Sequence, residues 1–219
     1  MLTGKKAVIF DMDGSLIDSM WLWPKVDEIY MTKYDLTMPE TFHKDIEGMS
    51  FTETAQYFVD TFPTLHRTVD EIKKEWQELT LEMYCTKVPL KPGAKTFLQK
   101  MKDAGIRLGI ATSNSKELAE AALKALHVRD FFDTVRTACE VEKGKPAPDV
   151  YLKAAEDLQV KPEECLVFED VPSGIKAGKN AGMTVCAVDD AFSAPDEAEK
   201  RELADYYIYD YAEVTGITV

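Results

Sequence analysis

The sequence predicts an α/β fold, with a doubly wound (Rossmann-like) parallel sheet as its core and a small inserted α-helical cap domain. Two observations predict the core: short apolar runs rich in β-branched residues recur along the chain, and helical patterns separate them. This alternation is typical of βαβ units, whose parallel sheet is covered by helices on both faces. A third observation predicts the insert, because the interval between the first two runs is much longer than a crossover helix needs.

The apolar runs are predicted as strands. Four of them are clear and lie at residues 7–10, 106–111, 165–168 and 183–188. Two weaker runs, at 206–209 and 133–136, are predicted as a fifth and a sixth strand.

Helices are predicted between these strands. Apolar residues recur at helical spacing from Phe97 to Ala104 and from Leu118 to Leu126. Asn114 is followed three residues later by Glu117, which predicts a helix start with Asn114 as its capping residue, and Pro172 suits the first turn of a later helix.

The long interval after the first strand is itself helical in pattern. One amphipathic face runs from Phe51 to Phe62 and another from Val69 to Met83, and each begins with capping-box spacing, Ser50…Glu53 and Thr68…Glu71. We predict a helical cap at residues 20–88 and a Rossmann-like core at 1–19 and 89–219. The alternative is that these helices pack on the single core of the sheet without forming a separate domain.

Composition excludes several classes of partner. The chain of 219 residues has 26 Lys and Arg against 39 Asp and Glu, a net charge of −13. Nucleic acid polymers and anionic membranes are bound through Lys and Arg, so neither is an expected partner. No apolar stretch has the length of a membrane span or a signal peptide. The four cysteines form no CxxC pair, and we expect buried, reduced thiols in a cytoplasmic protein.

Chemistry-bearing residues follow the predicted strands. Asp11, Asp13 and Gly14 follow the first strand, and Thr112, Ser113 and Asn114 follow the second. Lys145 lies downstream of residues 133–136, and Glu169 and Asp170 follow residues 165–168. Because ligands of open α/β sheets bind beyond the carboxyl ends of the strands, these residues are predicted to form a metal and phosphate site.

The residue types suit phosphoryl transfer. A cluster of carboxylates is stabilised by a divalent cation, and Asp11 and Asp170 fit the ligands that Mg²⁺ prefers. Asp11 is a candidate nucleophile towards phosphorus, and Asp13 is a candidate general acid and base. Lys145 and Thr112 are expected to hold the phosphoryl oxygens, with Ser113 and Asn114 as further phosphate ligands. Gly14 allows a tight turn that exposes amide donors to the phosphate.

Four motifs together resemble the haloacid dehalogenase-like hydrolase superfamily. They are Asp11-x-Asp13-Gly14-Ser15-Leu16, the strand-end Thr112, Lys145 in Gly-Lys-Pro-Ala-Pro-Asp, and Glu169-Asp170 with Ser173-Gly174. The helical insert is similar to the small cap of the phosphoglycolate phosphatase and β-phosphoglucomutase branch. The resemblance implies Mg²⁺-dependent phosphoryl transfer through an aspartyl-phosphate on Asp11. It also implies that the metal is held by the Asp11 carboxylate, the Asp13 carbonyl and Asp170, with Glu169 in or beside the shell.

Departures from the family pattern favour a phosphatase of a small phosphorylated metabolite. The dehalogenases of the superfamily lack the second aspartate of the first motif, which is Asp13 in this chain. Trp23 stands where the sugar-phosphate mutases carry His, and Phe51 stands where they carry the Arg that would clamp a second phosphate. Trp23, Met49, Ser50 and Phe51 are the candidate specificity residues, and a monomer is expected because the motifs need no partner chain.

Two alternatives stay open at this stage. One is a phosphosugar mutase of the same branch, which would convert β-glucose 1-phosphate to glucose 6-phosphate without releasing phosphate. The other is a non-catalytic phospho-aspartate sensor resembling a receiver domain, although such domains are shorter and carry their phosphoacceptor on a later strand.

Overall fold

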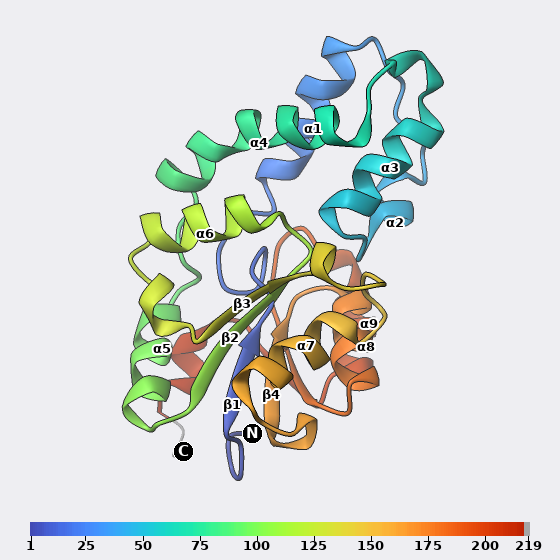
Figure 1. The fold of residues 1–219 in the computed structure, drawn as a ribbon. Helices are drawn as coiled ribbons and strands as arrows, with labels where there is room; N and C mark the ends of the chain where they lie inside the picture. Colours follow the sequence, from blue (N-terminus) through green and yellow to red (C-terminus); the bar gives the residue numbers. More distant parts are fainter. Residues whose placement is uncertain (217–219) are drawn as a thin grey trace.

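The computed structural model of the protein describes residues 1–216, so the last three residues of the predicted core range 89–219 lie outside the described residues. Its centre is a parallel sheet with the strand order β3-β2-β1-β4-β5-β6 (Figure 1). The strands are β1 (Ala7–Phe10), β2 (Arg107–Thr112), β3 (Thr134–Thr137), β4 (Cys165–Glu169), β5 (Thr184–Val188) and β6 (Tyr206–Ile208). All six predicted strands are confirmed, including the two weaker runs.

Helices cover both faces of the sheet (Figure 1). On one face lie α5 (Ala94–Asp103) and α6 (Lys116–Ala125), and on the other lie α7 (Asp149–Leu158), α8 (Pro172–Asn180) and α9 (Glu197–Leu203). Short 3₁₀ turns complete the connections: η1 (Pro63–Leu65), η2 (Arg129–Phe131), η3 (Ala138–Glu140), η4 (Pro162–Glu164), η5 (Ala194–Asp196) and η6 (Tyr211–Val214). Pro172 is the first residue of α8, as predicted.

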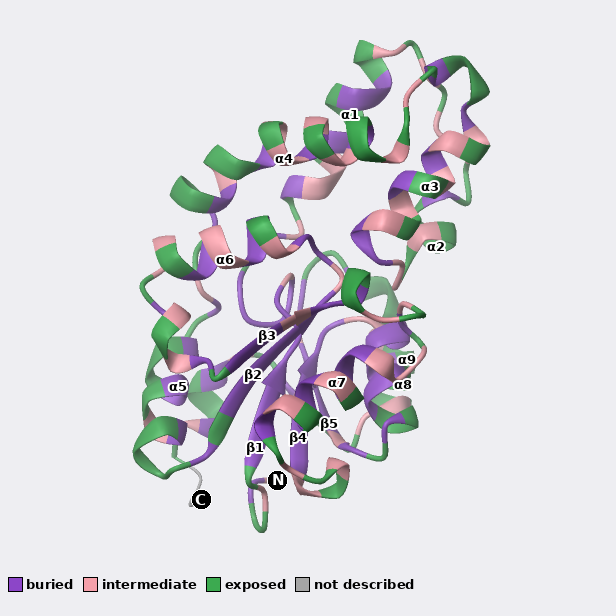
Figure 2. Ribbon diagram, viewed as in Figure 1, coloured by how far each residue is buried: buried purple, intermediate pink, exposed green. Residues whose placement is uncertain are grey.

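Strands β1 and β4 are buried on both faces (Figure 2). Along β1, Val8 and Phe10 point into one apolar cluster while Ala7 and Ile9 point into the other, because successive side chains of a strand alternate between faces. This two-sided burial explains why the strands are continuous apolar runs in the sequence.

The order of the strands fixes the position of the site. The chain leaves β1 towards β2 on one side and later returns to pair β4 with the other side of β1. Such a switch point is where open α/β sheets form a crevice at the carboxyl ends of the strands. Asp11 follows β1, Thr112 ends β2 and Glu169 ends β4, so all three residues meet there.

The interval between β1 and β2 is helical, as predicted. It holds α1 (Leu22–Lys33), α2 (Phe42–Ile46), α3 (Phe51–Thr61) and α4 (Val69–Thr86), which lie beyond the carboxyl ends of the strands (Figure 1). Both predicted capping boxes are confirmed at the starts of α3 and α4. The buried apolar residues of these helices form a continuous cluster with one face of the sheet. The division of the chain at residues 20 and 88 stays a prediction.

One predicted helix start is wrong. The residue that caps α6 is Ser115, whose side chain accepts a hydrogen bond from the Leu118 amide. Asn114 cannot act as the cap because its amide group is turned towards Asp13 and Tyr84.

The expectation that all four thiols are buried is also wrong. Cys165 and Cys186 are buried, but Cys85 and Cys139 are exposed, and all four are free. Cys85 lies in the last turn of α4 and Cys139 lies in η3, and both are at the surface. The sequence pattern around them does not indicate this exposure. Among residues 1–216, no helix is both long enough and apolar enough to cross a membrane.

Candidate active site

Three buried carboxylates meet at the switch point of the sheet. Asp11, Glu169 and Asp170 are at most 6% exposed, and one carboxylate oxygen of each lies within 4.8 Å of the others. Burial raises the pKa of Asp11 and of Asp170, and the charge of Glu169 raises both further. A cluster of this kind needs positive charge to keep its carboxylates ionised.

Lys145 supplies part of that charge. Its Nζ lies 2.6 Å from Asp11 Oδ1 and 2.5 Å from Glu169 Oε1, and the side chain is buried. Burial alone would lower the pKa of Lys145, but the two carboxylates outweigh it and raise that pKa above its usual value. Lys145 is therefore a fixed ammonium group inside the site.

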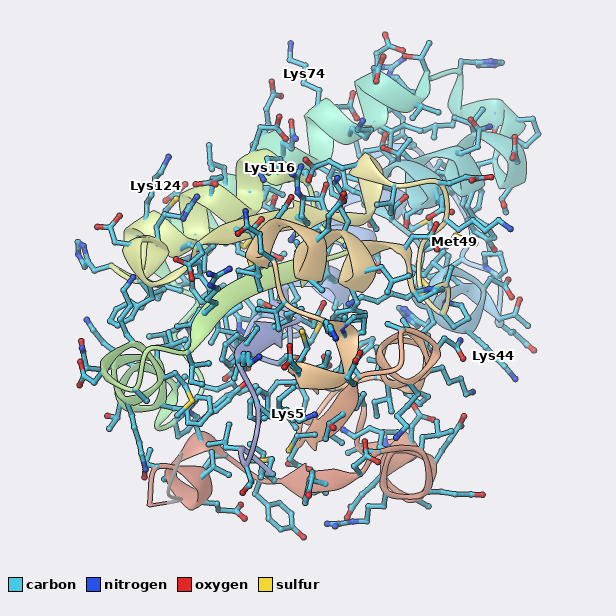
Figure 3. The ribbon with its side chains drawn as sticks, turned by 60° about the horizontal axis from the view of Figure 1, so that its bottom comes forward. Lys5, Lys44, Met49, Lys74, Lys116 and Lys124 are labelled. Atoms are coloured by element: carbon cyan, nitrogen blue, oxygen red, sulfur yellow. The ribbon has the colours of Figure 1, made fainter. Side chains whose placement is uncertain are left out.

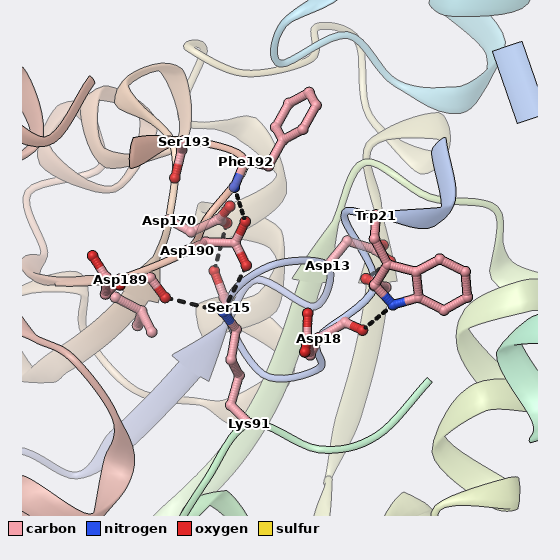
Figure 4. Close-up of polar contacts among 12 residues, drawn as sticks. Asp13, Ser15, Asp18, Trp21, Lys91, Asp170, Asp189, Asp190, Phe192 and Ser193 are labelled. Carbon is pink, nitrogen blue, oxygen red and sulfur yellow. Dashed lines mark hydrogen bonds and ion pairs between the residues drawn. The ribbon is translucent and has the colours of Figure 1, made fainter. Parts of the chain in front are cut away.

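Glu169 and Asp170 differ in how their oxygens are occupied. Glu169 Oε1 accepts hydrogen bonds from Lys145 and from the Tyr151 hydroxyl, at 2.6 Å for the latter, and Oε2 accepts one from the Asp170 amide. Asp170 Oδ1 accepts one from the Ser15 hydroxyl at 2.9 Å (Figure 4), whereas Asp170 Oδ2 is buried without a partner. A buried carboxylate oxygen without a donor is costly, and a hard cation such as Mg²⁺ is the kind of group that satisfies it.

Two glycines allow the carboxylates to sit where they do. A Cβ on Gly14 would lie 2.2 Å from Asp170 Oδ2, and a Cβ on Gly174 would lie 1.9 Å from Glu169 Oε1. Gly14 also has a φ of +80°, which favours glycine. Its own amide donates to the Ile17 carbonyl, and the role of Gly14 in phosphate binding stays a prediction.

Asp13 is held by three donors from three parts of the chain. Its Oδ1 accepts hydrogen bonds from Ser19 at 2.6 Å and from the Tyr84 hydroxyl at 2.5 Å, and its Oδ2 accepts one from Asn114 at 3.0 Å. Burial raises the pKa of Asp13, and these hydrogen bonds oppose the rise. Tyr84 belongs to α4, so the helical insert contributes directly to the site. Sequence reasoning missed Tyr84, which continues the apolar face of α4 and belongs to no motif.

The three residues at the end of β2 have different partners. The Thr112 hydroxyl oxygen accepts a hydrogen bond from the Asn114 amide, which leaves its proton available to a ligand. The Ser113 hydroxyl faces the carbonyl of Gly48 in the insert. All three line the cavity described next.

A cavity of about 210 Å³ lies between the strand ends and the helical insert. From the core, its wall includes Asp11, Asp13, Thr112, Lys145 and Asp170. From the insert, it includes Trp23, Asp27, His43, Met49, Phe51, Thr54 and Trp76. Of the four predicted specificity residues, Ser50 is the one outside this wall, because its side chain caps α3.

The insert contacts the core on both sides of the cavity. The Phe51 amide donates to the Ser113 carbonyl at 2.7 Å, and Glu47 Oε1 accepts from the Ser173 amide at 3.0 Å. Together with the Tyr84 contact to Asp13, these bonds hold the insert over the strand ends.

Asp27 is the second residue that sequence reasoning missed. It lies on α1, is 9% exposed, and has no hydrogen bond or ion pair within residues 1–216. Burial raises the pKa of this carboxyl to about 7. In the sequence, a buried acidic residue of an amphipathic helix cannot be distinguished from an exposed one.

Replacing Asp27 with Asn is expected to change how stability depends on pH. Because its pKa is higher in the native than in the unfolded chain, the native protein binds more protons between about pH 4 and pH 7, and its free energy of unfolding falls as pH rises through that range. The free energy of unfolding of the wild type falls by at most about 4 kcal/mol over this range. The other ionisable side chains in the insert's part of the cavity wall are His43 and Glu47.

The measurement is urea unfolding of wild type and Asp27→Asn at pH 4.5 and pH 8. We expect similar stability at the lower pH and a more stable variant at the higher pH. A variant less stable than wild type at pH 8 would show that the Asp27 carboxylate has a stabilising partner.

Comparison with known proteins agrees with this geometry. Residues 8–188 match the family model described as haloacid dehalogenase-like hydrolase. The chain belongs to the haloacid dehalogenase-like hydrolase family.

Relatives within the family are phosphatases. A phosphorylated carbohydrates phosphatase of Thermotoga maritima is 32% identical over 178 residues, which are 81% of this chain and 82% of the relative. A validoxylamine A 7'-phosphate phosphatase of Streptomyces hygroscopicus subsp. limoneus is 30% identical over 213 residues, 95% of each chain. The crystal structure of CbbY from Rhodobacter sphaeroides in complex with phosphate has a TM-score of 0.81 over 96% of each chain at 24% identity, a likeness of fold.

Proposed function

We propose that the protein is a Mg²⁺-dependent phosphatase that hydrolyses a small phosphorylated metabolite through an aspartyl-phosphate. The observation that carries the proposal is the buried cluster of Asp11, Asp170 and Lys145, with one carboxylate oxygen left without a donor. Family membership and the activities of the relatives support it.

Asp11 is the proposed nucleophile. Its carboxylate attacks phosphorus, the bond between phosphorus and the ester oxygen breaks, and the phosphoryl group is transferred to Asp11. Lys145, 2.6 Å from Asp11, neutralises the charge of the phosphoryl oxygens, and the Thr112 hydroxyl donates a hydrogen bond to them. We infer that Ser113 and Asn114 act mainly through the contacts that position the insert and Asp13.

Asp13 is the proposed general acid and base. In its protonated form it gives its proton to the departing alkoxide, and as a carboxylate it then removes a proton from water. That water attacks phosphorus, the bond to Asp11 breaks, and phosphate and the free Asp11 carboxylate are released. Burial favours the protonated form that the first step needs.

Mg²⁺ is the proposed cofactor, with Asp11, the Asp13 carbonyl and Asp170 as its ligands. When bound, it would supply positive charge to the phosphoryl group and to the carboxylates around it. Glu169 lies beside this shell in our proposal, because its oxygens already accept bonds from Lys145, Tyr151 and the Asp170 amide. Its role is to position Lys145.

The helical insert at residues 20–88 is proposed to act as a cap that excludes bulk water and selects the leaving group. Trp23, Met49 and Phe51 line the cavity and support this role. We also propose a monomer, since one chain supplies every residue of the site, and a reducing cytoplasmic setting, which the four free cysteines support.

Removal of divalent cations is expected to abolish turnover. Purified protein treated with EDTA should release no phosphate from p-nitrophenyl phosphate, and MgCl₂ should restore release, because the buried carboxylates otherwise repel the anionic substrate. Ca²⁺, which takes more ligands at longer distances, serves as the control and should restore little activity. Full turnover in EDTA would contradict the metal assignment.

A further inference from the structure

The helical insert forms part of the cavity wall, and that part holds one unpaired carboxylate. Asp27 follows Trp23 by four residues on α1, so both side chains project from the same face of the helix, and both line the cavity. Asp27 has no hydrogen-bond donor or cation as a partner within residues 1–216. A buried carboxylate without a partner is destabilising, and a ligand that brings positive charge would compensate it.

Aromatic rings surround the same space. Trp23 and Phe51 lie with their ring centroids 6.2 Å apart, Phe51 and Trp76 lie 5.5 Å apart, and all three rings line the cavity. The faces of aromatic rings attract cations, and a carboxylate combined with several rings is a typical binding site for an ammonium group.

The charges of the cavity wall also favour a cationic group on the ligand. The insert's part of the wall contains Asp27 and Glu47 but no Lys or Arg. Among residues 1–216, Lys145 is the sole Lys or Arg in the whole wall. Lys145 is already paired with Asp11 and Glu169. Lys44, Lys74 and Lys124 extend outward from the surface (Figure 3), and none of them belongs to this wall. A second anionic group on the substrate would therefore meet repulsion, and a cationic group would meet attraction.

We propose that the substrate is a phosphomonoester of a cationic amino alcohol, whose ammonium group binds between Asp27 and the rings of Trp23, Phe51 and Trp76. This inference rests on the proposed phosphatase function and specifies the leaving group. Asp27 is a specificity residue in this proposal and takes no part in the chemical steps. Its ionised form is the one that binds the cation, which an ammonium group beside it would favour.

Trp76 would also suit a different leaving group, a neutral polyol, and the experiment must distinguish it from a cationic one. Its indole Nε1 is buried without a partner and belongs to the same cavity wall. If the leaving group were a neutral polyol, its hydroxyl groups would accept from Trp76 and donate to Asp27, and no cation would be required.

The experiment compares two phosphomonoesters of the same shape. Phosphocholine carries a quaternary ammonium group, and 3,3-dimethylbutyl phosphate replaces its nitrogen with carbon, so the two esters have the same shape and differ in the charge of the leaving group. Glycerol 3-phosphate represents a neutral polyol, and p-nitrophenyl phosphate reports the phosphatase activity itself. Each is measured as kcat/KM with wild type, Asp27→Asn and the control Glu28→Gln, which changes an exposed residue next to Asp27 on α1.

We expect wild type to prefer phosphocholine over its neutral analogue by about tenfold or more, as a desolvated cation–π contact with an ion pair would give. Asp27→Asn should remove most of that preference by lowering kcat/KM for phosphocholine more than for 3,3-dimethylbutyl phosphate. Glu28→Gln should keep the wild-type preference and the wild-type activity on p-nitrophenyl phosphate.

Three outcomes would overturn the inference: equal turnover of the two matched esters by wild type, a preference for glycerol 3-phosphate over both, or a preference for phosphocholine that survives in Asp27→Asn. Loss of p-nitrophenyl phosphate hydrolysis in wild type itself would instead contradict the proposed phosphatase function. The two failures are thus distinguishable.

Discussion

Asp11→Asn is expected to lower the turnover of p-nitrophenyl phosphate by at least about 10⁴-fold, since an amide oxygen at this position is too weak a nucleophile to attack phosphorus. The structure places Asp11 directly after β1, with Lys145 Nζ 2.6 Å from its Oδ1, whereas Glu169 is engaged by both Lys145 and Tyr151. Thermal unfolding should show that the variant is folded, because Asn has nearly the same shape and removes one of several buried like charges.

The matched control is Asp18→Asn. Asp18 is exposed close to the site, and its backbone carbonyl, not its carboxylate, accepts the indole hydrogen bond of Trp21 (Figure 4). It should keep wild-type turnover. A folded Asp11→Asn protein with near-normal activity would show that another residue is the nucleophile.

Lys145→Met is expected to affect both stability and activity. Without the ammonium group, the carboxylates of Asp11 and Glu169 stay buried with no compensating charge, and breaking a buried ion pair in this way costs about 3–5 kcal/mol. Turnover should fall by about 10²–10³-fold, the usual effect of removing one group that stabilises charge in a transition state. Urea unfolding in EDTA and initial rates in MgCl₂ measure the two effects.

Two further measurements test the cause of the instability. Adding Glu169→Gln to Lys145→Met removes one of the unpaired charges and should restore part of the lost stability without restoring turnover. Lys153→Met, which removes an exposed lysine paired with Glu156, should change stability by less than about 1 kcal/mol. If Lys145→Met and Lys153→Met were equally stable, the ammonium group would not be needed to hold the carboxylates.

The negative charge of the whole chain makes these internal cations important. A net charge of −13 repels an anionic substrate, so the attraction must come from groups at the site. In the core those groups are Lys145 and the proposed Mg²⁺. In the insert the sign is reversed, because Asp27 and Glu47 face the cavity there. The cavity is thus arranged for a substrate with its negative charge at one end and positive charge at the other.

Much of the fold could be predicted because its signals are local. β1 and β4 are short apolar runs buried on both faces, and the capping boxes of α3 and α4 consist of residues three apart. No capping box marks the start of α1 or α2, so their bounds within the predicted helical insert could not be predicted. The Asn114 cap was predicted wrongly for a related reason: a side chain that suits a cap was recruited by Asp13 and Tyr84, which lie far from it in the sequence.

The sequence by itself determined the strands of the sheet, the helical nature of the insert and the types of residue that follow each strand, since each of these depends on neighbours along the chain. A parallel sheet then brings the strand ends together whatever the details of packing, so the meeting of Asp11, Lys145, Glu169 and Asp170 was predictable. Only the tertiary structure decided which oxygens are already occupied, that Tyr84 reaches Asp13, and that Asp27 and Trp76 face the cavity without partners. Those contacts join elements whose relative placement depends on how the insert packs over the sheet, and no spacing in the sequence encodes that placement.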